Sequence, residues 1–273
     1  MTREFSLAHF TLLDCPPPEF VRIAATAGYD FAGLRLIPVD RPGEPRYVLA
    51  ENRALRRETA YAFADTGIRL LDIEVAQISE SFDARACLPA LDAAADLGAR
   101  SLLATVWTPD RNRAIDGFST LCELAQPFDM TVMLEFISFA DLATLGQAVD
   151  VVRASGCSNV GILVDTLHCH LAHTSLDDLA TLPAKWLPYA HLCDAPAGIP
   201  PTRDARRRIA REGRLLPGEG AIDVAGIVSR LPPASILSIE APNPARAKAV
   251  GAQQYAVNCL AAAKRCLAAS TVP

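Results

Sequence analysis

Short apolar runs rich in Val, Ile, Leu and Phe alternate along this chain with longer segments of helical periodicity. Such alternation is typical of repeated βα units around a parallel sheet, because each crossover between parallel strands needs room for a helix. The runs predict eight strands, at residues 5–10, 31–37, 68–75, 100–107, 131–137, 160–166, 189–194 and 235–241.

The connections from each predicted helix to the next strand also repeat. Four predicted helices end in a glycine shortly before the next strand, where a left-handed cap is expected: Gly28, Gly67, Gly98 and Gly156. Eight strands alternating with helices in 273 residues predict an α/β fold, a single (β/α)8 TIM barrel that forms one domain over residues 1–273. An open doubly wound sheet is the alternative, but the chain lacks a Gly-x-Gly-x-x-Gly after its first strand and lacks a P-loop.

The composition limits the kinds of molecule that this protein is expected to bind. The net charge of −5 and pI near 5.6 give no global positive field for nucleic acid or an anionic membrane surface. No apolar run reaches the eighteen or more residues of a membrane span. Eight cysteines without a C-x-x-C pair, and an N-terminus without the apolar segment of a secretory signal, predict a reduced cytoplasmic protein with free thiols. The expected partner is a small molecule.

Charged side chains stand where four consecutive strands end. In a TIM barrel the carboxyl ends of the strands build the functional face, and they carry Glu135, Asp165, His191 and Glu240. Alone, each is typical of a helix cap, a loop charge or a core histidine. Together, three carboxylates near one axis would repel and raise each other's pKa values unless a cation lay among them. This ligand set predicts a divalent ion, Mn²⁺, Mg²⁺, Co²⁺ or a catalytic Zn²⁺.

The same residues carry a resemblance to a known family. The stretches "LEF", "VDTLH", "HLCDAP", "PGEGAID" and "SIEAPNP" resemble the xylose-isomerase-like TIM-barrel superfamily, in particular the sugar phosphate isomerase/epimerase group. The resemblance implies that Glu135, Asp165, His191 and Glu240 hold the metal, and that Glu135 and Glu240 also act as the acid/base pair. It implies that His168, in the D-x-x-H spacing, contacts a substrate oxygen or a second metal; a helix-capping loop histidine is the alternative.

The chemistry gives this implication a mechanism. A metal-bound ketose has an acidified C–H next to its carbonyl, and one carboxylate removes that proton to give a metal-stabilised cis-enediolate. If the proton returns on the opposite face of the same carbon, the product is an epimer. If it returns to the neighbouring carbon, the product is an aldose. If a β-hydroxyl is lost instead, the product is dehydrated. The expected function is therefore a divalent-metal-dependent isomerase or epimerase of carbohydrate metabolism, acting on a ketose or keto sugar derivative, with manganese as one candidate ion.

Three alternative functions differ in the site residues that they require. A dehydratase of a cyclic keto compound, such as an inosose or 3-dehydroshikimate, would use the same site. A DNA-repair endonuclease of the superfamily would need additional histidines after the second and third strands, where the chain has Arg35 and Glu74. A non-catalytic sugar-binding barrel would not need both Glu135 and Glu240.

Further residues are candidates for binding the carbohydrate or keto-acid substrate. Glu74 and Arg35, expected to end the third and second strands, either face the substrate or form a salt bridge with each other. Trp107, after the fourth strand, either walls the pocket or packs in the core. His170 and His173 are expected to be solvated or helix-start residues.

An arginine-rich segment follows the seventh strand. Residues 194–223 contain Arg203, Arg206, Arg207, Arg208, Arg211 and Arg214. The segment is either a solvated amphipathic helix or a lid in which one or two arginines hold an anionic substrate. We expect a mixture, with most of the arginines solvated and one functional, and the candidates to test are Arg203, Arg211 and Arg214. The alanine-rich helix expected at residues 245–270 closes the outer ring or contributes to a homo-oligomer.

Overall fold

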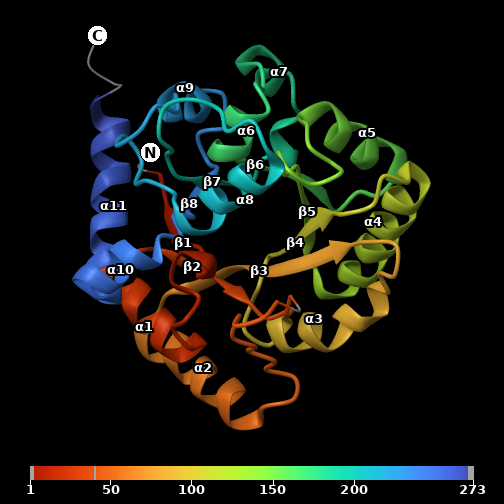
Figure 1. The fold of residues 1–273 in the computed structure, drawn as a ribbon. Helices are drawn as coiled ribbons and strands as arrows, with labels where there is room; N and C mark the ends of the chain where they lie inside the picture. The colour runs from red at the N-terminus through yellow and green to blue at the C-terminus, as the bar shows by residue number, and fades with distance from the viewer. Residues whose placement is uncertain (1–2, 40, 270–273) are drawn as a thin grey trace.

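A computed structural model describes residues 3–39 and 41–269. The strands form a closed barrel in which each strand pairs in parallel with the next, and β8 pairs with β1 (Figure 1). The predicted (β/α)8 TIM barrel is thus confirmed. The strands are β1 (Phe5–Leu7), β2 (Phe31–Arg35), β3 (Arg69–Ile78), β4 (Ser101–Val106), β5 (Thr131–Glu135), β6 (Val160–Asp165), β7 (Tyr189–Leu192) and β8 (Ile236–Ile239).

Helices surround the barrel, and the first and last long helices lie side by side (Figure 1). No helix among the described residues is long and apolar enough to cross a membrane. The α-helices are α1 (Pro17–Ala27), α2 (Arg53–Thr66), α3 (Leu88–Ala95), α4 (Arg111–Ala125), α5 (Leu145–Ser155), α6 (Thr166–Leu171), α7 (Leu176–Ala180), α8 (Arg203–Glu212), α9 (Val224–Ser229), α10 (Pro244–Val250) and α11 (Ala252–Ala269).

The predicted joins have the expected geometry. Gly28, Gly67, Gly98 and Gly156 all have positive φ angles, between 67° and 90°. A residue with a side chain is strained in this region, so glycine lets each helix end and the chain turn back to the barrel.

Most strand boundaries differ from the sequence-based expectation by one to three residues, and three differences change the architecture. β1 ends at Leu7, because His9–Leu12 form a 3₁₀ turn. β3 continues to Ile78, because Ala76–Ile78 pair with Ala104–Val106 of β4; Glu74 is therefore inside the strand and not at its end. The expected C-terminal helix is two helices, since Gly251 breaks it with φ 85° and ψ 151°; its expected end at Ser270 lies outside the described residues.

Strand periodicity gives the barrel two separate cores. Most apolar side chains pack between the strands and the helices. A smaller cluster, which includes Met133, Leu163, Tyr189 and Ile236, fills the barrel itself. Because side chains alternate along a strand, the residues two or four positions after these face the barrel axis as well.

Candidate metal centre and substrate pocket

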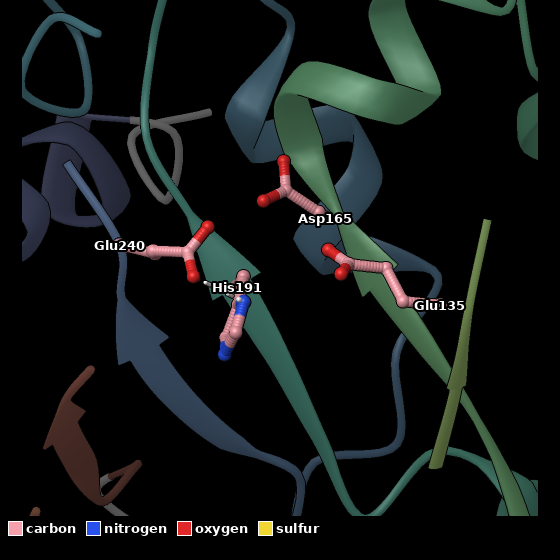
Figure 2. A group of neighbouring side chains, drawn as sticks. All are labelled: Glu135, Asp165, His191 and Glu240. Carbon is pink, nitrogen blue, oxygen red and sulfur yellow. Dashed lines mark ion pairs between the residues drawn. The ribbon is translucent and has the colours of Figure 1, made fainter. Parts of the chain in front are cut away.

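The four predicted ligands come together at the mouth of the barrel. Glu135 and Asp165 end β5 and β6, His191 lies in β7, and Glu240 directly follows β8. All four are buried, and one ligand atom from each lies within 4.8 Å of the others. Figure 2 shows the four side chains gathered at the ends of neighbouring strands.

Alternation along the strands explains this convergence. Glu135 stands two residues after the inward-facing Met133, and Asp165 stands two after Leu163. Asp165 is the direct cross-strand partner of His191, so the two share one level of the barrel. The apolar layer therefore lies below the cluster. The next inward position supplies a ligand in β5, β6 and β7, whereas for β8 the ligand, Glu240, stands four residues after Ile236.

Asp165 is fixed by the backbone that follows it. Its Oδ1 accepts hydrogen bonds from the N–H groups of Leu167 at 2.7 Å and His168 at 3.3 Å, which caps α6. The position of Asp165 is thus compatible with both roles, helix cap and metal ligand. The cap holds the carboxylate in one orientation.

Arg214, one of the three arginines considered for a lid, contacts two of the expected metal ligands, a role that the sequence did not predict. It follows α8, and its guanidinium contacts Asp165 Oδ2 at 2.5 Å and Glu240 Oε2 at 2.7 Å. Its Nε donates to Ala210 O at 2.8 Å, which anchors the side chain. Burial opposes its charge, but Asp165, the Cys193 sulfur and Glu240 together hold the pKa of Arg214 well above its usual value.

The carboxylates of the cluster lie in unequal electrostatic environments. Burial, and then the charges of Glu240 and Asp165, raise the pKa of Glu135 well above its usual range. Burial acts in the same direction on Glu240, but Arg214 and His191 outweigh it and lower the pKa of Glu240. Mutual repulsion therefore affects Glu135 as expected, whereas Arg214 supplies a cation for Glu240.

The donor set fits a divalent metal ion. Neither ring nitrogen of His191 has a hydrogen-bond partner among the described residues, although Nδ1 lies 3.4 Å from Glu240 Oε1. A buried imidazole without partners beside three carboxylates matches an ion that takes oxygen and nitrogen ligands. Cys193 hydrogen-bonds with Thr166 and contacts Arg214, so it packs beside the site, as expected, outside the four-residue group.

A pocket of about 520 Å³ opens above the cluster. Glu135 and Glu240 line it, and so do four residues named from sequence: Arg35, Glu74, Trp107 and His168. Arg203 is not among its lining residues: 67% of its side chain is exposed, and it lies 3.7 Å from Asp141. Arg211 and Arg214 line the pocket instead.

Arg35 and Glu74 form the expected salt bridge and also line the pocket, while their contact with a substrate stays a prediction. Arg35 Nη2 lies 2.8 Å from Glu74 Oε2, so the salt bridge between adjacent strands forms. Both side chains also line the pocket. Trp107 lines it as well, and its Nε1 donates to Thr105 Oγ1 at 2.9 Å.

His168 is a buried pocket residue. Its Nδ1 lies 3.1 Å from Ser138 Oγ, and burial lowers the pKa of His168 to about 4. The imidazole is therefore neutral near pH 7 and able to donate or accept a hydrogen bond. His170 and His173 are absent from the pocket lining; His173 is exposed.

The fold and the site agree with a match to a known family. Residues 21–261 match the family model described as the xylose isomerase-like TIM barrel. The chain belongs to this family, as its motifs indicated.

Individual relatives are more distant. An inosose isomerase from Bacillus licheniformis is 30% identical over 123 residues, which are 43% of this chain and 41% of the relative. A D-psicose 3-epimerase from Enterocloster bolteae is 26% identical over 121 residues, 43% of this chain and 35% of the relative. The matches thus span less than half the length of either relative.

One solved structure superposes over nearly the whole chain. The IOLI protein with a bound zinc atom has a TM-score of 0.80 at 18% identity, covering 97% of this chain and 98% of that one. This likeness supports the fold.

Proposed function

We propose that this protein is a divalent-metal-dependent isomerase or epimerase of a ketose or a related keto sugar. The observation that carries the proposal is the convergence of Glu135, Asp165, His191 and Glu240 within 4.8 Å. Two members of this cluster, Glu135 and Glu240, line a pocket. The two relatives named above, an inosose isomerase and a D-psicose 3-epimerase, support a polyhydroxylated ketone as substrate.

The same four side chains would hold the ion. A bound divalent cation supplies Lewis-acid polarisation of a substrate carbonyl, which acidifies the neighbouring C–H. Manganese as the ion, a cytoplasmic location and a homo-oligomeric state stay predictions.

Glu135 and Glu240 form the acid/base pair. Arg214 and His191 lower the pKa of Glu240, which favours it as the proton acceptor, whereas burial and the neighbouring carboxylates raise the pKa of Glu135, which favours it as the proton donor. Transfer by the two groups on opposite faces of one carbon inverts it, and return of the proton to the adjacent carbon moves the carbonyl.

Neighbouring residues bind and orient the substrate. His168 and Arg214 present hydrogen-bonding groups at the same level as the cluster, while Trp107 and Phe139 form an apolar wall. Such a wall limits access of water to the reacting carbon.

The first test measures metal content. Wild-type protein, purified without chelator and reloaded with Mn²⁺ or Zn²⁺, is expected to hold about one ion per chain, because four protein ligands complete one site. Asp165→Ala and Glu240→Gln are expected to lose most of it. Glu219→Gln is the matched control, since Glu219 is partly exposed and pairs with Arg246 outside the cluster. Wild-type protein without metal under every loading condition would refute the proposal.

The second test follows the proton. In D₂O, the loaded enzyme is expected to exchange the C–H next to the carbonyl of an inosose or D-psicose, and Glu135→Gln is expected to reduce kcat by about 100-fold or more. Loss of water from the substrate in place of isomerisation would instead support the dehydratase alternative.

A further inference from the structure

Two of the pocket arginines are committed to carboxylates near its opening. Arg35 is held by Glu74 on one side and by Glu44 on the other, where its Nη1 lies 2.9 Å from Glu44 Oε1. Arg41 lies 3.7 Å from the second oxygen of the same Glu44. Glu44 therefore contacts both guanidinium groups, and this long ion pair is the one that Arg41 forms among the described residues.

Arg211 has no such partner. It stands in the last turn of α8, is half-buried, and lines the same pocket as Glu135 and Glu240. Within the described residues, its guanidinium makes no ion pair and no hydrogen bond. Burial, together with the nearby charges of Arg41 and Arg207, lowers the pKa of Arg211 to about 10.

A half-buried guanidinium beside other guanidinium groups is unfavourable unless an anion joins them. The planar fork of arginine matches the oxygens of a carboxylate or phosphate, and such charge-assisted hydrogen bonds are among the strongest in proteins. Glu44 is already shared by two arginines, and no other carboxylate among the described residues pairs with Arg211.

We propose that Arg211, assisted by Arg41, is the binding site for an anionic group of the substrate, a carboxylate or a phosphate. This inference rests on the proposed function, because it places the acidic group in the pocket where the keto sugar reacts. The substrate class then narrows from neutral ketones such as inososes to keto-sugar acids or ketose phosphates.

The position of Arg211 suits this role. No ion pair connects it to the four-residue cluster, so an anion at Arg211 leaves the cluster free for the carbonyl end of the same molecule. Trp107 and Phe139 line the same pocket and offer an apolar surface for the carbon chain between the two ends.

The test compares matched ligands by calorimetric titration. D-fructose is the neutral probe, D-fructose 6-phosphate carries a phosphate, and 5-keto-D-gluconate carries a carboxylate. The proteins are the wild type, Arg211→Gln, Arg211→Lys and Arg208→Gln. Arg208 is the control because it lies on the same helix, is exposed and is absent from the pocket lining.

At least one acidic probe is expected to bind the wild type about tenfold more tightly than D-fructose, and Arg211→Gln is expected to remove that advantage. Arg208→Gln should keep it, and Arg211→Lys should keep part of it. The acidic probe that shows the effect identifies carboxylate or phosphate as the group.

Equal binding of acidic and neutral probes, equal effects of the Arg211 and Arg208 variants, or no binding of either acidic probe would overturn the proposal. Titrations are run on Mn²⁺-loaded and chelator-treated protein. If the metal-dependent function is wrong, the Mn²⁺-loaded and chelator-treated proteins bind the probes alike. The effect of Arg211→Gln on binding of the acidic probe is still measured in that case. Failure of the one proposal is thus distinguishable from failure of the other.

Discussion

His9 shows how a single buried residue supports the pocket from behind. Its Nδ1 accepts a hydrogen bond from the Arg35 backbone N–H at 3.0 Å, and its Nε2 lies 2.9 Å from Cys15 O. These two contacts define a neutral ring with the proton on Nε2. His9 thereby fixes the end of β2, from which the Arg35 side chain reaches the pocket.

The protonation of His9 predicts acid instability. Burial, opposed by the hydrogen bond to Cys15 and assisted by the Arg35 charge, lowers the pKa of His9 from 6.5 to about 4. The folded state thus excludes a proton that the unfolded chain binds. Its contribution to stability is present above pH 6.5 and is lost as the pH falls toward 4, by up to about 3 kcal/mol.

Urea unfolding of metal-free protein from about pH 7 to about pH 4 measures this loss. His9→Asn is expected to be less stable than the wild type at neutral pH but to show a flatter decline. Parallel curves for the two proteins would mean that other groups cause the acid instability.

At the scale of elements, α5 carries two glycines with opposite roles. Gly146 is in the first turn, has ordinary helical geometry, and an added Cβ would meet no atom within 4 Å. Gly156 ends the helix at φ 67°. The same substitution should therefore have opposite signs at the two ends.

Gly146→Ala is expected to raise the free energy of unfolding by about 0.5 kcal/mol, because alanine loses less entropy in a helix. Gly156→Ala is expected to lower it by about 1 kcal/mol or more, since alanine is strained at positive φ. Chemical denaturation of both variants measures the difference. A stabilising Gly156→Ala would show that the chain can end α5 in another way.

At the scale of the whole molecule, the barrel must join its first and last strands. Thr11 follows β1, and its hydroxyl donates to Ile239 O at 2.9 Å and accepts from Ala241 N–H at 3.1 Å. This buried hydroxyl links residues about 230 positions apart. It also stands beside Glu240, so closure of the barrel and position of that carboxylate are coupled.

Thr11→Val keeps the shape but leaves the buried Ala241 N–H without its hydrogen-bond acceptor, whereas Ile239 O keeps its bond from Ala8 N–H. The substitution is expected to cost about 1–3 kcal/mol of stability. Thr120→Val is the control, because its hydroxyl bonds within α4 and is exposed. Denaturant unfolding compares the two. Equal losses would mean that Thr11 contributes little to barrel closure.

Much of the site was predictable from sequence because it depends on local periodicity. Successive side chains of a strand point to opposite faces of the sheet. The apolar residues that point into the barrel therefore determine which of the following residues also point inward. That rule placed Glu135, Asp165, His191 and Glu240 at one level, and parallel pairing in a closed barrel brought them together.

Only the tertiary structure decided which arginines reach the pocket. Arg203 and Arg214 belong to the same polar segment, yet the first is exposed and the second contacts Asp165, 49 residues earlier in the chain. Likewise β3 extends past Glu74 because β4 offers it pairing partners. The sequence by itself determined the strands, the helix caps and the inward-facing ligands, since these follow from backbone geometry within each segment. The partners of Arg35 and Arg214, and the position of Arg211 in the pocket, depend on contacts between distant segments, and no local pattern encodes those.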